Sequence, residues 1–324
     1  MKITIGFIAE QSGVSKSTVS RYLNGGYVSE ELKSIIAYNI KKYHYVPNQF
    51  AQSLKAKESM MVGVVIPRVN SYAAQETLMG IETVLESHHY KMMMSSSSLS
   101  LEKELEAIQL FDQQKVDGII LLATQITKEH TNLFNRLSVP IIIIGQEAQG
   151  QSYFVYNDHS AGYIMAEHAY KQGYMTWDYI GVGESDRAVG ILRKQGMYLM
   201  AKTDSDIKVH EHKGDFSFAT SERIAEEILS DNLPHCIICA TDTIALAVMK
   251  VAKRLNKDIP SDVQIIGSGN YDITTLSYPE LSSVSFPYRE TGFDAAKALL
   301  ELMHDSDKKF QVVVDVSLVP RGSL

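Results

Sequence analysis

The sequence predicts an α/β protein with a small helical N-terminal headpiece and a two-lobed body of two doubly wound parallel sheets. Charge is the first observation behind this prediction. The first 60 residues carry eight Lys/Arg and four Asp/Glu, a charge of +4, whereas the other 264 carry 23 and 34, a charge of −11. Short polar helical patterns fill the first segment, and strands alternate with helices in the second. With 324 residues, 45% of them hydrophobic, the chain is long enough for two or three folded domains.

The first two predicted helices lie in residues 1–46 and meet at a glycine corner. Thr4 is a candidate N-cap for the first helix, and Gly13 ends it. Ser15 is placed to cap a second helix, which ends at the Asn-Gly-Gly sequence at 24–26. The side chains expected to face inward from these two helices are Ile5, Ile8, Ala9, Val19, Tyr22 and Leu23.

A third helix is expected to begin after Ser29 as its N-cap. Glu30 and Glu31 in its first turn and Lys41 and Lys42 in its last turn suit the helix dipole. Its apolar face and its inward-packing end are expected to consist of Leu32, Ile35, Ile36, Ile40, Tyr43, His44 and Tyr45.

Two short helices joined by a glycine corner and backed by a third form a helix-turn-helix, which binds DNA. Arg21 and Lys16 on the second helix can donate to guanine edges in the major groove, and Ser17 can serve either base. A basic head on an acidic body is the charge pattern of a nucleic-acid module fused to another domain. The alternative is a solvated face on a small helical bundle. The headpiece residues predicted to contact DNA are Thr4, Lys16, Ser17, Thr18, Ser20, Arg21, Asn24 and Ser29.

The strings GVSKSTVSRYLNG, YVS and YVPNQFAQSLKAK follow one another in the order and spacing of the LacI/GalR family of sugar-responsive repressors. The chain resembles this family along nearly its whole length. The resemblance implies a periplasmic-binding-protein-like body and a homodimer that binds pseudo-palindromic double-stranded operator DNA. One departure is Phe7, where the family often has an acidic residue on the surface of the first helix.

In that family the PNxxA segment is a hinge helix that enters the minor groove, and here the hinge helix and linker correspond to residues 47–58. Pro47 suits the first turn of a helix, and Leu54 is apolar enough to wedge between base steps. Because so short a helix is marginal in water, we expect it to order only on DNA and against its dimer mate. The alternative is a plain linker. The hinge residues expected at the DNA are Asn48, Ala51, Gln52 and Leu54.

The body shows two series of apolar runs separated by helical patterns, as buried parallel strands do. Two such sheets side by side form a two-lobed clamp with its ligand between them, and the resemblance implies three chain crossings. The expected lobes are 59–157 with 288–310, and 158–287 with 311–324. The runs expected to form strands are 60–67, 90–94, 116–123, 139–145, 177–182, 235–240 and 262–269.

Some patterns in the body look chemical but lack the context that chemistry needs. Cys236 and Cys239 form a CxxC in an apolar strand, where positions three apart face opposite sides, so a metal or redox role is disfavoured. The GVG at 181–183 lacks the third glycine of a dinucleotide fingerprint, because Asp186 stands there. The run Met92–Met94 is interpreted as strand core. With no supported catalytic set, we predict no enzyme activity, no cofactor and no metal site.

Other features bear on location and on the C-terminus. The sequence shows no signal peptide or membrane span, and its two cysteines suit a reducing cytoplasm. The LVPRGS at 318–323 coincides with a thrombin-cleavage sequence but also resembles the end of this family's last strand. No leucine heptads follow that strand, so we expect dimers rather than tetramers.

The effector site is expected at strand ends and loops between the lobes. The resemblance implies that Arg193 is the effector arginine, Arg187 a second one, and Phe216 a stacking aromatic. Arg68 follows the first strand and is expected to face the cleft. The remaining residues expected to contact the effector are Ser71, Tyr72, Gln146, Thr241, Asp242 and Asn270.

The predicted cleft departs from the family's pattern for neutral sugars. Those members usually have aspartates where this chain has Gly145 and Gly269, and more often an acid where it has Arg68. The loss of two negative charges and the gain of a guanidinium suit a phosphate group, which arginine binds bidentately. The stretches PRVNS, YIGVGESD and CATDTIALA look most like the trehalose-operon and sucrose-operon branches of the family. We therefore expect a repressor of a sugar-utilisation operon that is induced by trehalose 6-phosphate or sucrose 6-phosphate.

Other functions stay open at this point. A regulator of the same kind could respond to an unphosphorylated sugar or act with a corepressor protein. A sugar-binding transport protein is disfavoured by the DNA-binding headpiece, and a cytosolic α/β enzyme by the lack of a catalytic set. The operator sequence is not predicted.

Overall fold

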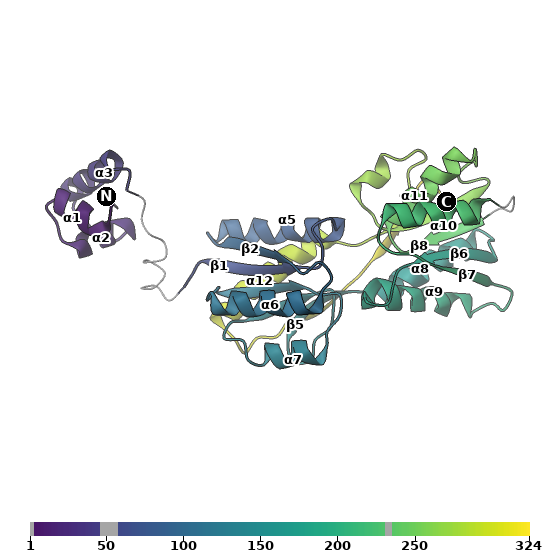
Figure 1. The fold of residues 1–324 in the computed structure, drawn as a ribbon, viewed down its shortest axis with the longest axis horizontal. Coiled ribbons are helices and arrows are strands. Elements are labelled where there is room, and N and C mark those ends of the chain that lie inside the picture. Colours follow the sequence, from purple (N-terminus) through teal and green to yellow (C-terminus); the bar gives the residue numbers. More distant parts are fainter. Residues whose placement is uncertain (1–2, 46–57, 231–234) are drawn as a thin grey trace. The chain divides into compact units, whose positions relative to one another are not determined.

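The computed structural model describes residues 3–45, 58–230 and 235–324. The chain divides into two compact units, Met1–Met60 and Met61–Leu324, each of which is described by itself (Figure 1). The predicted hinge residues Asn48, Ala51, Gln52 and Leu54 lie outside the described residues.

The headpiece consists of α1 (Ile5–Gln11), α2 (Lys16–Leu23) and α3 (Glu30–Lys42). The Thr4 hydroxyl accepts a hydrogen bond from Phe7 N at 3.3 Å, and the Ser15 hydroxyl accepts one from Thr18 N at 3.2 Å. Gly13 has a φ of +64°, the left-handed conformation that commonly follows a helix end. The first two predicted helices and their caps are therefore confirmed. The apolar residues buried between the helices are Ile8, Ala9, Val19, Val28, Ile36 and Tyr45.

Three details of the third helix differ from the prediction. Ile35 is 38% exposed, because Asn39 faces α1 instead and its amide donates to the Ser12 hydroxyl at 3.1 Å. Ser29 occupies the N-cap position without a side-chain capping hydrogen bond. His44 has a φ of +48° just after the helix end, and its side chain is exposed rather than packed inward.

The first lobe of the body, the N-lobe, contains a six-stranded parallel sheet in the order β11-β5-β4-β3-β1-β2. The central strands β1, β3 and β4 are buried almost throughout, as their continuous apolar sequences predict. β2 lies at an edge, so Met94 is 48% exposed, and the prediction of strand core is wrong for it. The strands are β1 (Met61–Ile66), β2 (Lys91–Ser96), β3 (Gly118–Leu122), β4 (Ile141–Ile144), β5 (Ser152–Tyr156) and β11 (Gln311–Val314). The helices are α5 (Tyr72–Ser87), α6 (Leu101–Gln113), α7 (Lys128–Phe134) and α12 (Tyr288–His304).

The second lobe, the C-lobe, repeats this plan with the strand order β12-β10-β9-β8-β6-β7, in which only the edge strand β12 is antiparallel to its neighbour. Its strands are β6 (Thr176–Gly181), β7 (Lys208–Lys213), β8 (His235–Cys239), β9 (Val263–Gly269), β10 (Ser282–Ser285) and β12 (Ser317–Val319). Its helices are α8 (Asp158–Lys171), α9 (Lys194–Ala201), α10 (Phe218–Leu229) and α11 (Asp242–Arg254), with a π-helix at Arg187–Arg193 and a 3₁₀ turn at Asp272–Thr275. The predicted fold class is confirmed.

The chain crosses between the lobes three times: after β5, after β10 and after β11. The last crossing lies later than predicted. β11 pairs in parallel with β5, with Val314 opposite Tyr156, so residues 311–314 belong to the N-lobe sheet and not to the C-lobe. The C-lobe then receives only β12 and the residues after it.

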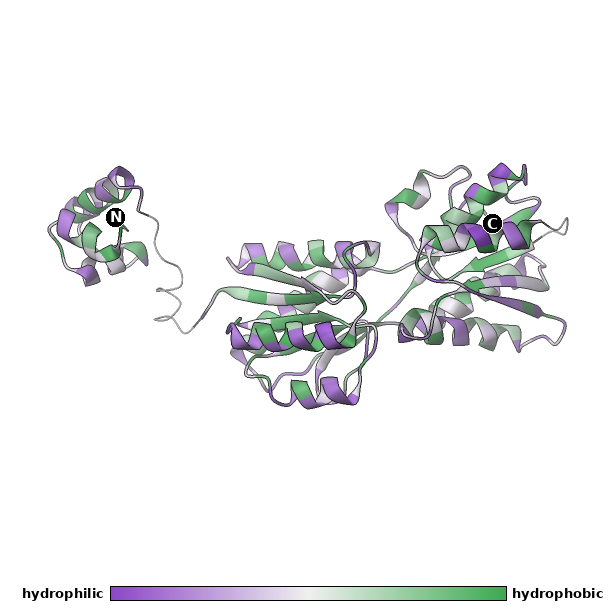
Figure 2. Ribbon diagram, viewed as in Figure 1, coloured by the Kyte–Doolittle hydropathy of each residue, from purple (hydrophilic) through white to green (hydrophobic). Residues whose placement is uncertain are grey.

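In each lobe, two helices pack closely against each other because glycines stand at their contact. A Cβ on Gly80 of α5 or on Gly292 of α12 would collide with the backbone of the other helix. Gly162 of α8 and Gly196 of α9 meet the facing backbone in the same way. Figure 2 shows hydrophobic strands inside each lobe and helices with mixed hydrophobic and hydrophilic residues around them.

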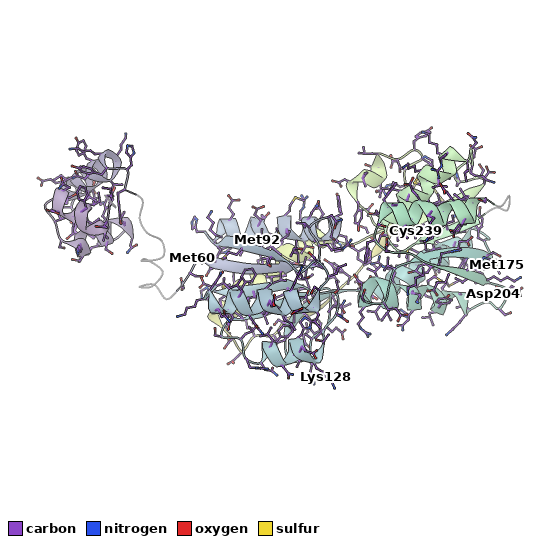
Figure 3. All side chains as sticks on the ribbon, in the orientation of Figure 1. Met60, Met92, Lys128, Met175, Asp204 and Cys239 are labelled. Atoms are coloured by element: carbon purple, nitrogen blue, oxygen red, sulfur yellow. The ribbon has the colours of Figure 1, made fainter. Side chains whose placement is uncertain are left out.

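The two cysteines lie in the interior of the C-lobe, where Figure 3 labels Cys239. Cys236 and Cys239 are fully buried in β8, and burial raises the pKa of the Cys236 thiol to about 12. Such a thiol is protonated at neutral pH and is a poor nucleophile or metal ligand. In the described part of the chain, no helix is both long enough and apolar enough to span a membrane.

Candidate DNA-binding surface and effector cleft

The outward face of α2 is polar and carries two cations. Lys16, Ser17 and Arg21 are exposed, while Val19 on the opposite face is fully buried. The ion pair found in the described part of the headpiece joins Lys33 to another residue of α3 and involves neither cation of α2. Two positive charges without a carboxylate partner on an exposed helix face can bind phosphates and guanine edges.

The other predicted DNA contacts of the headpiece surround this face. The Ser15 hydroxyl lies 2.7 Å from the Ser17 hydroxyl and 2.9 Å from that of Thr18. The hydroxyls of Ser17 and Thr18 can therefore give up their contact with Ser15 and contact DNA instead. Asn24 is exposed at the end of α2, and Ser20 is partly buried. Thr4 and Ser29 are exposed at the N-caps of α1 and α3.

The body holds a cavity of about 370 Å³ between its two lobes, at the carboxyl ends of β1 and β8. A smaller cavity of about 130 Å³ adjoins it and shares part of its lining. We call these two cavities together the effector cleft; their size suits a small-molecule ligand. Six of the predicted effector residues line it, namely Arg68, Ser71, Tyr72, Arg193, Phe216 and Thr241.

Arg68 enters the cleft from the loop after β1. Its guanidinium lies over the ring of Phe216, 4.1 Å from the ring centroid, so the contact joins the N-lobe to the C-lobe. Burial lowers the pKa of Arg68, which still leaves the group charged at neutral pH. No carboxylate of the described chain lies within ion-pair distance of this guanidinium. Arg68 is therefore a partly buried cation without an anionic partner.

Arg193 is the other arginine of the cleft, and its charge is already compensated. The side chain is 3% exposed and donates to Asp158 Oδ1 from Nε at 3.1 Å and from Nη2 at 2.5 Å. Its Nη1 donates to the carbonyl oxygen of Ala240 at 2.5 Å, and Phe286 lies beneath the guanidinium, 4.8 Å away. Burial disfavours the charge, but Asp158 more than offsets this, and the pKa of Arg193 is raised.

Tyr72 forms a second bridge between the lobes. Its ring stacks on Tyr271 with the centroids 4.3 Å apart, and its hydroxyl accepts a hydrogen bond from Asp272 N at 3.0 Å. Ser71 caps α5 at the edge of the same loop, with its hydroxyl accepting from Ala74 N. The loop after β1 thus contacts the C-lobe through Arg68, and the start of α5 contacts it through Tyr72.

Asp242 does not line either cavity of the effector cleft. It is fully buried, and its carboxylate accepts hydrogen bonds from Tyr271 N at 2.8 Å and from the Ser283 hydroxyl at 2.5 Å. Burial raises the pKa of Asp242 to about 6. Its neighbour Thr241 does line the cleft and also caps α11. The expected effector contact at Asp242 is instead a structural link between α11, β10 and the loop after β9.

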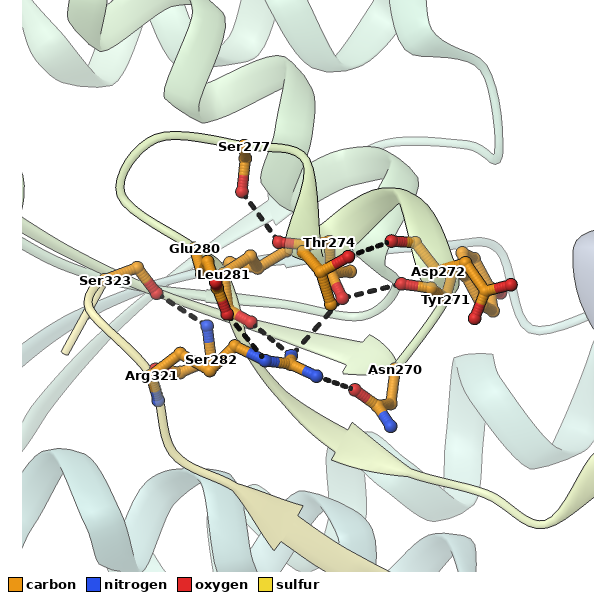
Figure 4. Close-up of polar contacts among 11 residues, drawn as sticks. Asn270, Tyr271, Asp272, Thr274, Ser277, Glu280, Leu281, Ser282, Arg321 and Ser323 are labelled. Carbon is orange, nitrogen blue, oxygen red and sulfur yellow. Dashed lines mark hydrogen bonds and ion pairs between the residues drawn. The ribbon is translucent and has the colours of Figure 1, made fainter.

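Asn270 is likewise held by the C-lobe (Figure 4). Its amide oxygen accepts from Arg321 Nη2 at 2.7 Å, and its amide nitrogen donates to the Ser285 hydroxyl at 3.2 Å. Arg321 and Ser323 belong to the LVPRGS sequence, and the buried Ser323 hydroxyl donates to Ile265 O at 2.6 Å. This C-terminal sequence is therefore an integrated part of the C-lobe. Its Arg321 binds the amide oxygen of Asn270, the residue that was expected to contact the effector.

Gln146 and Arg187 line a different cavity, of about 420 Å³, beside the first crossing between the lobes. The Arg187 side chain is exposed, while its backbone N donates to Thr124 O of the N-lobe at 3.1 Å. Gln146 is 4% exposed and lies just after β4. The structure does not bring these two residues together with Arg68, because a wall that includes Tyr156 and Asp158 separates the two cavities.

The cleft also contains residues that were not predicted from the sequence to contact the effector. Asp186 caps the π-helix and lines both cavities of the cleft, and so does Tyr288, which follows the second crossing. Tyr271 lies against Tyr72. The position of Asp186, in the loop after a buried strand and directly before a helix, is a sequence signal that could have identified it.

Comparison with known proteins agrees with this architecture. Residues 4–48 match the family model for bacterial regulatory proteins of the lacI family, and residues 166–324 match the periplasmic binding protein-like domain. The sucrose operon repressor of Staphylococcus xylosus is 34% identical over 318 residues, which cover 96% of this chain and 97% of that protein. The Lac repressor dimer bound to operator and the anti-inducer ONPF has a TM-score of 0.90 at 21% identity, with 100% and 99% coverage. The trehalose repressor from Escherichia coli has a TM-score of 0.72 at 20% identity over 80% of this chain and 99% of that one.

The two structural likenesses show the fold, and the sequence match along almost the entire chain shows the relationship. The likeness to the Lac repressor dimer covers all of this chain, its helix-turn-helix headpiece and its two-lobed body alike. The chain therefore belongs to the lacI family of bacterial regulatory proteins and is a DNA-binding transcriptional regulator.

Proposed function

We propose that this regulator represses a sugar-utilisation operon and is released from its operator by a phosphorylated disaccharide, of the trehalose 6-phosphate or sucrose 6-phosphate type. The observation that carries the proposal is Arg68, a partly buried guanidinium in the cleft that forms no ion pair with a carboxylate of the described residues. A phosphate can accept two parallel hydrogen bonds from such a group. A neutral sugar offers it no charge.

The surroundings of Arg68 support a phosphate in this cleft. The strand ends at Gly145 and Gly269 carry no carboxylate that would repel an anion. The ring of Phe216 packs against the guanidinium of Arg68, and both residues line the cavity. Thr241 and Ser71 add hydroxyl groups at the rim of the same cavity. Arg193, whose charge is used by Asp158, contributes a rigid wall rather than the phosphate contact.

On the DNA side, α2 is proposed to lie in the major groove, with Arg21 and Lys16 at base edges or phosphates. A homodimer would place two such helices on a pseudo-palindromic operator in the cytoplasm. Two apolar side chains on the C-lobe surface support a protein interface, since they would otherwise face water: Leu276 at 82% and Tyr278 at 98% exposure. Closing the lobes on the effector is proposed to separate the two hinge segments.

The test is an operator titration of the full chain in the absence and presence of trehalose 6-phosphate, sucrose 6-phosphate, trehalose and sucrose. The proposal expects tight operator binding alone and its loss with at least one sugar phosphate at a concentration where the free sugar has no effect. If only a free sugar released the protein from its operator, the result would instead support a regulator that responds to an unphosphorylated sugar. Operator binding that is insensitive to all four compounds would refute sugar control.

A further inference from the structure

The effector cleft contains an acid, Asp186, that forms no ion pair among the described residues. Asp186 lies in the loop after β6 and lines both cavities of the cleft together with Arg68. Its Oδ1 accepts a hydrogen bond from Val189 N at 3.0 Å, which caps the π-helix. In the described part of the chain, its Oδ2 makes no hydrogen bond. Oδ1 therefore caps the π-helix, and Oδ2 can accept a hydrogen bond from a ligand in the cleft.

Asp186 and Arg68 face the same cavity from different lobes without touching. The acid that could have compensated an arginine in this region, Asp158, is taken by Arg193. Among the described residues, neither Asp186 nor Arg68 forms an ion pair with any other group. Two partly buried opposite charges held apart across a cavity are unfavourable unless a third group satisfies both.

The chemistry of a ligand that would satisfy both charges is narrow. A carboxylate only accepts hydrogen bonds, so its partner must present hydroxyl or amine hydrogens. A guanidinium only donates, so its partner must present acceptor oxygens, and anionic ones bind most strongly. A sugar phosphate carries hydroxyl donors at one end and anionic oxygens at the other.

We propose that Asp186 is the hydroxyl-binding carboxylate of the effector cleft, so that the ligand lies with its phosphate toward Arg68 and a sugar hydroxyl on Asp186 Oδ2. This inference rests on the proposed function and adds the direction in which the ligand lies. It also accounts for a cleft that lacks carboxylates at Gly145 and Gly269, because the acid comes from the start of the π-helix instead. The ligand then joins the N-lobe to the C-lobe by its two chemically different ends.

The test compares Asp186→Asn with Arg68→Ala by calorimetry on the full chain, using trehalose, trehalose 6-phosphate, sucrose and sucrose 6-phosphate. Asparagine caps helices as well as aspartate does, so this change removes the charge and keeps the Val189 contact. We expect Asp186→Asn to weaken the free sugar by about 10- to 150-fold, the worth of a hydrogen bond to a charged group. The phosphorylated sugar should lose less, because the substitution also removes a negative charge near the phosphate.

Arg68→Ala should change the preference in the opposite direction, by weakening the phosphorylated sugar more than the free one. Asp305→Asn, an exposed acid at the end of α12, is the control for net charge and should change neither affinity. Affinities of Asp186→Asn equal to those of the wild type, or a larger loss for the phosphorylated sugar than for the free one, would overturn the inference. If the wild type bound none of the four compounds, the proposed function itself would fail, and the inference with it.

Discussion

The two walls of the effector cleft each present an arginine, and the two arginines are used differently. Arg193 on the C-lobe wall is 3% exposed and is held by Asp158 and a backbone carbonyl. Arg68 on the N-lobe wall is partly buried, rests on Phe216 and has no ion pair among the described residues. Arg193 therefore stabilises its own lobe, whereas Arg68 has a positive charge that can bind an anionic ligand.

This difference matters because the family resemblance alone favours Arg193, and not Arg68, as the arginine that binds the effector. Arg193 is the residue that the resemblance identifies as the effector arginine, yet its charge is compensated within the chain. Removing one partner of a buried ion pair lowers the free energy of unfolding. Removing an uncompensated cation from a binding site instead lowers the affinity for an anionic ligand. Each arginine can therefore be tested by the quantity that its substitution changes.

The largest effect is expected at Arg193. Arg193→Ala leaves Asp158 buried without its cation and should lower the free energy of unfolding by about 3–5 kcal/mol. Urea denaturation of wild type and variant measures this difference. Arg68→Ala is the matched control in the same cleft and should change the free energy of unfolding by less than about 1 kcal/mol. Equal destabilisation by the two substitutions would remove the distinction between the walls.

A second effect on stability is expected at Asp242, which has no ion-pair partner among the described residues. Burial raises its pKa from 3.8 to about 6, so between about pH 4 and pH 6 the folded protein holds a proton that the unfolded chain has released. Stability contributed by this group therefore falls as the pH rises through that range, by about 3 kcal/mol in total.

Asp242→Asn removes this titration and keeps an acceptor for Tyr271 N. Its free energy of unfolding, minus that of the wild type, should increase from pH 4 to pH 7. The difference between the two proteins cancels the contributions of all other acids, so urea denaturation at pH 4.5, 5.5 and 7 is sufficient. A difference that stays constant with pH would show that Asp242 is not a neutral acid in the folded state at low pH.

The comparison extends to the headpiece, where Arg21 is also without an ion pair in the described structure. Arg21→Ala should weaken binding to the cognate operator by about 1–3 kcal/mol and relax the preference at one base pair, while leaving stability unchanged. Lys33→Ala, which breaks an exposed pair with Glu30, should cost less and change no preference. Unchanged operator affinity of Arg21→Ala in a titration would contradict the assignment of α2 as the recognition helix.

The headpiece could be predicted almost completely, because its determinants are local. Thr4, Gly13 and Ser15 each act within three or four residues of their own position, and the structure has the caps and the turn where the sequence places them. In the body, the predicted apolar runs mark β1, β2, β3, β4, β6, β8 and β9, whereas the largely buried strands β5 and β10 were not predicted, because serine and tyrosine interrupt their short apolar sequences. The edge strands β7 and β11 were not predicted. Four of the six residues of β7 and two of the four residues of β11 are exposed, and the apolar run of β11 is only three valines long.

The use of each side chain in the cleft could not be predicted, because it depends on residues distant in the sequence. Arg193 meets Asp158 and Ala240, which lie 35 and 47 residues away, and Asn270 meets Arg321, which lies 51 residues away. A sequence pattern shows that a polar residue follows a strand. It does not show whether another part of the chain already satisfies that residue.

Recognition of a phosphate by Arg68, which forms no ion pair among the described residues, can be measured by calorimetry on the wild type and on Arg68→Ala. Binding of a phosphorylated disaccharide and of its free sugar to the two proteins gives four dissociation constants. We expect Arg68→Ala to weaken binding of the phosphorylated sugar by about 1.5–3 kcal/mol, roughly 10- to 150-fold, and to leave binding of the free sugar almost unchanged. Operator affinity without effector should stay as in the wild type. Equal losses for both ligands would mean that Arg68 recognises no phosphate.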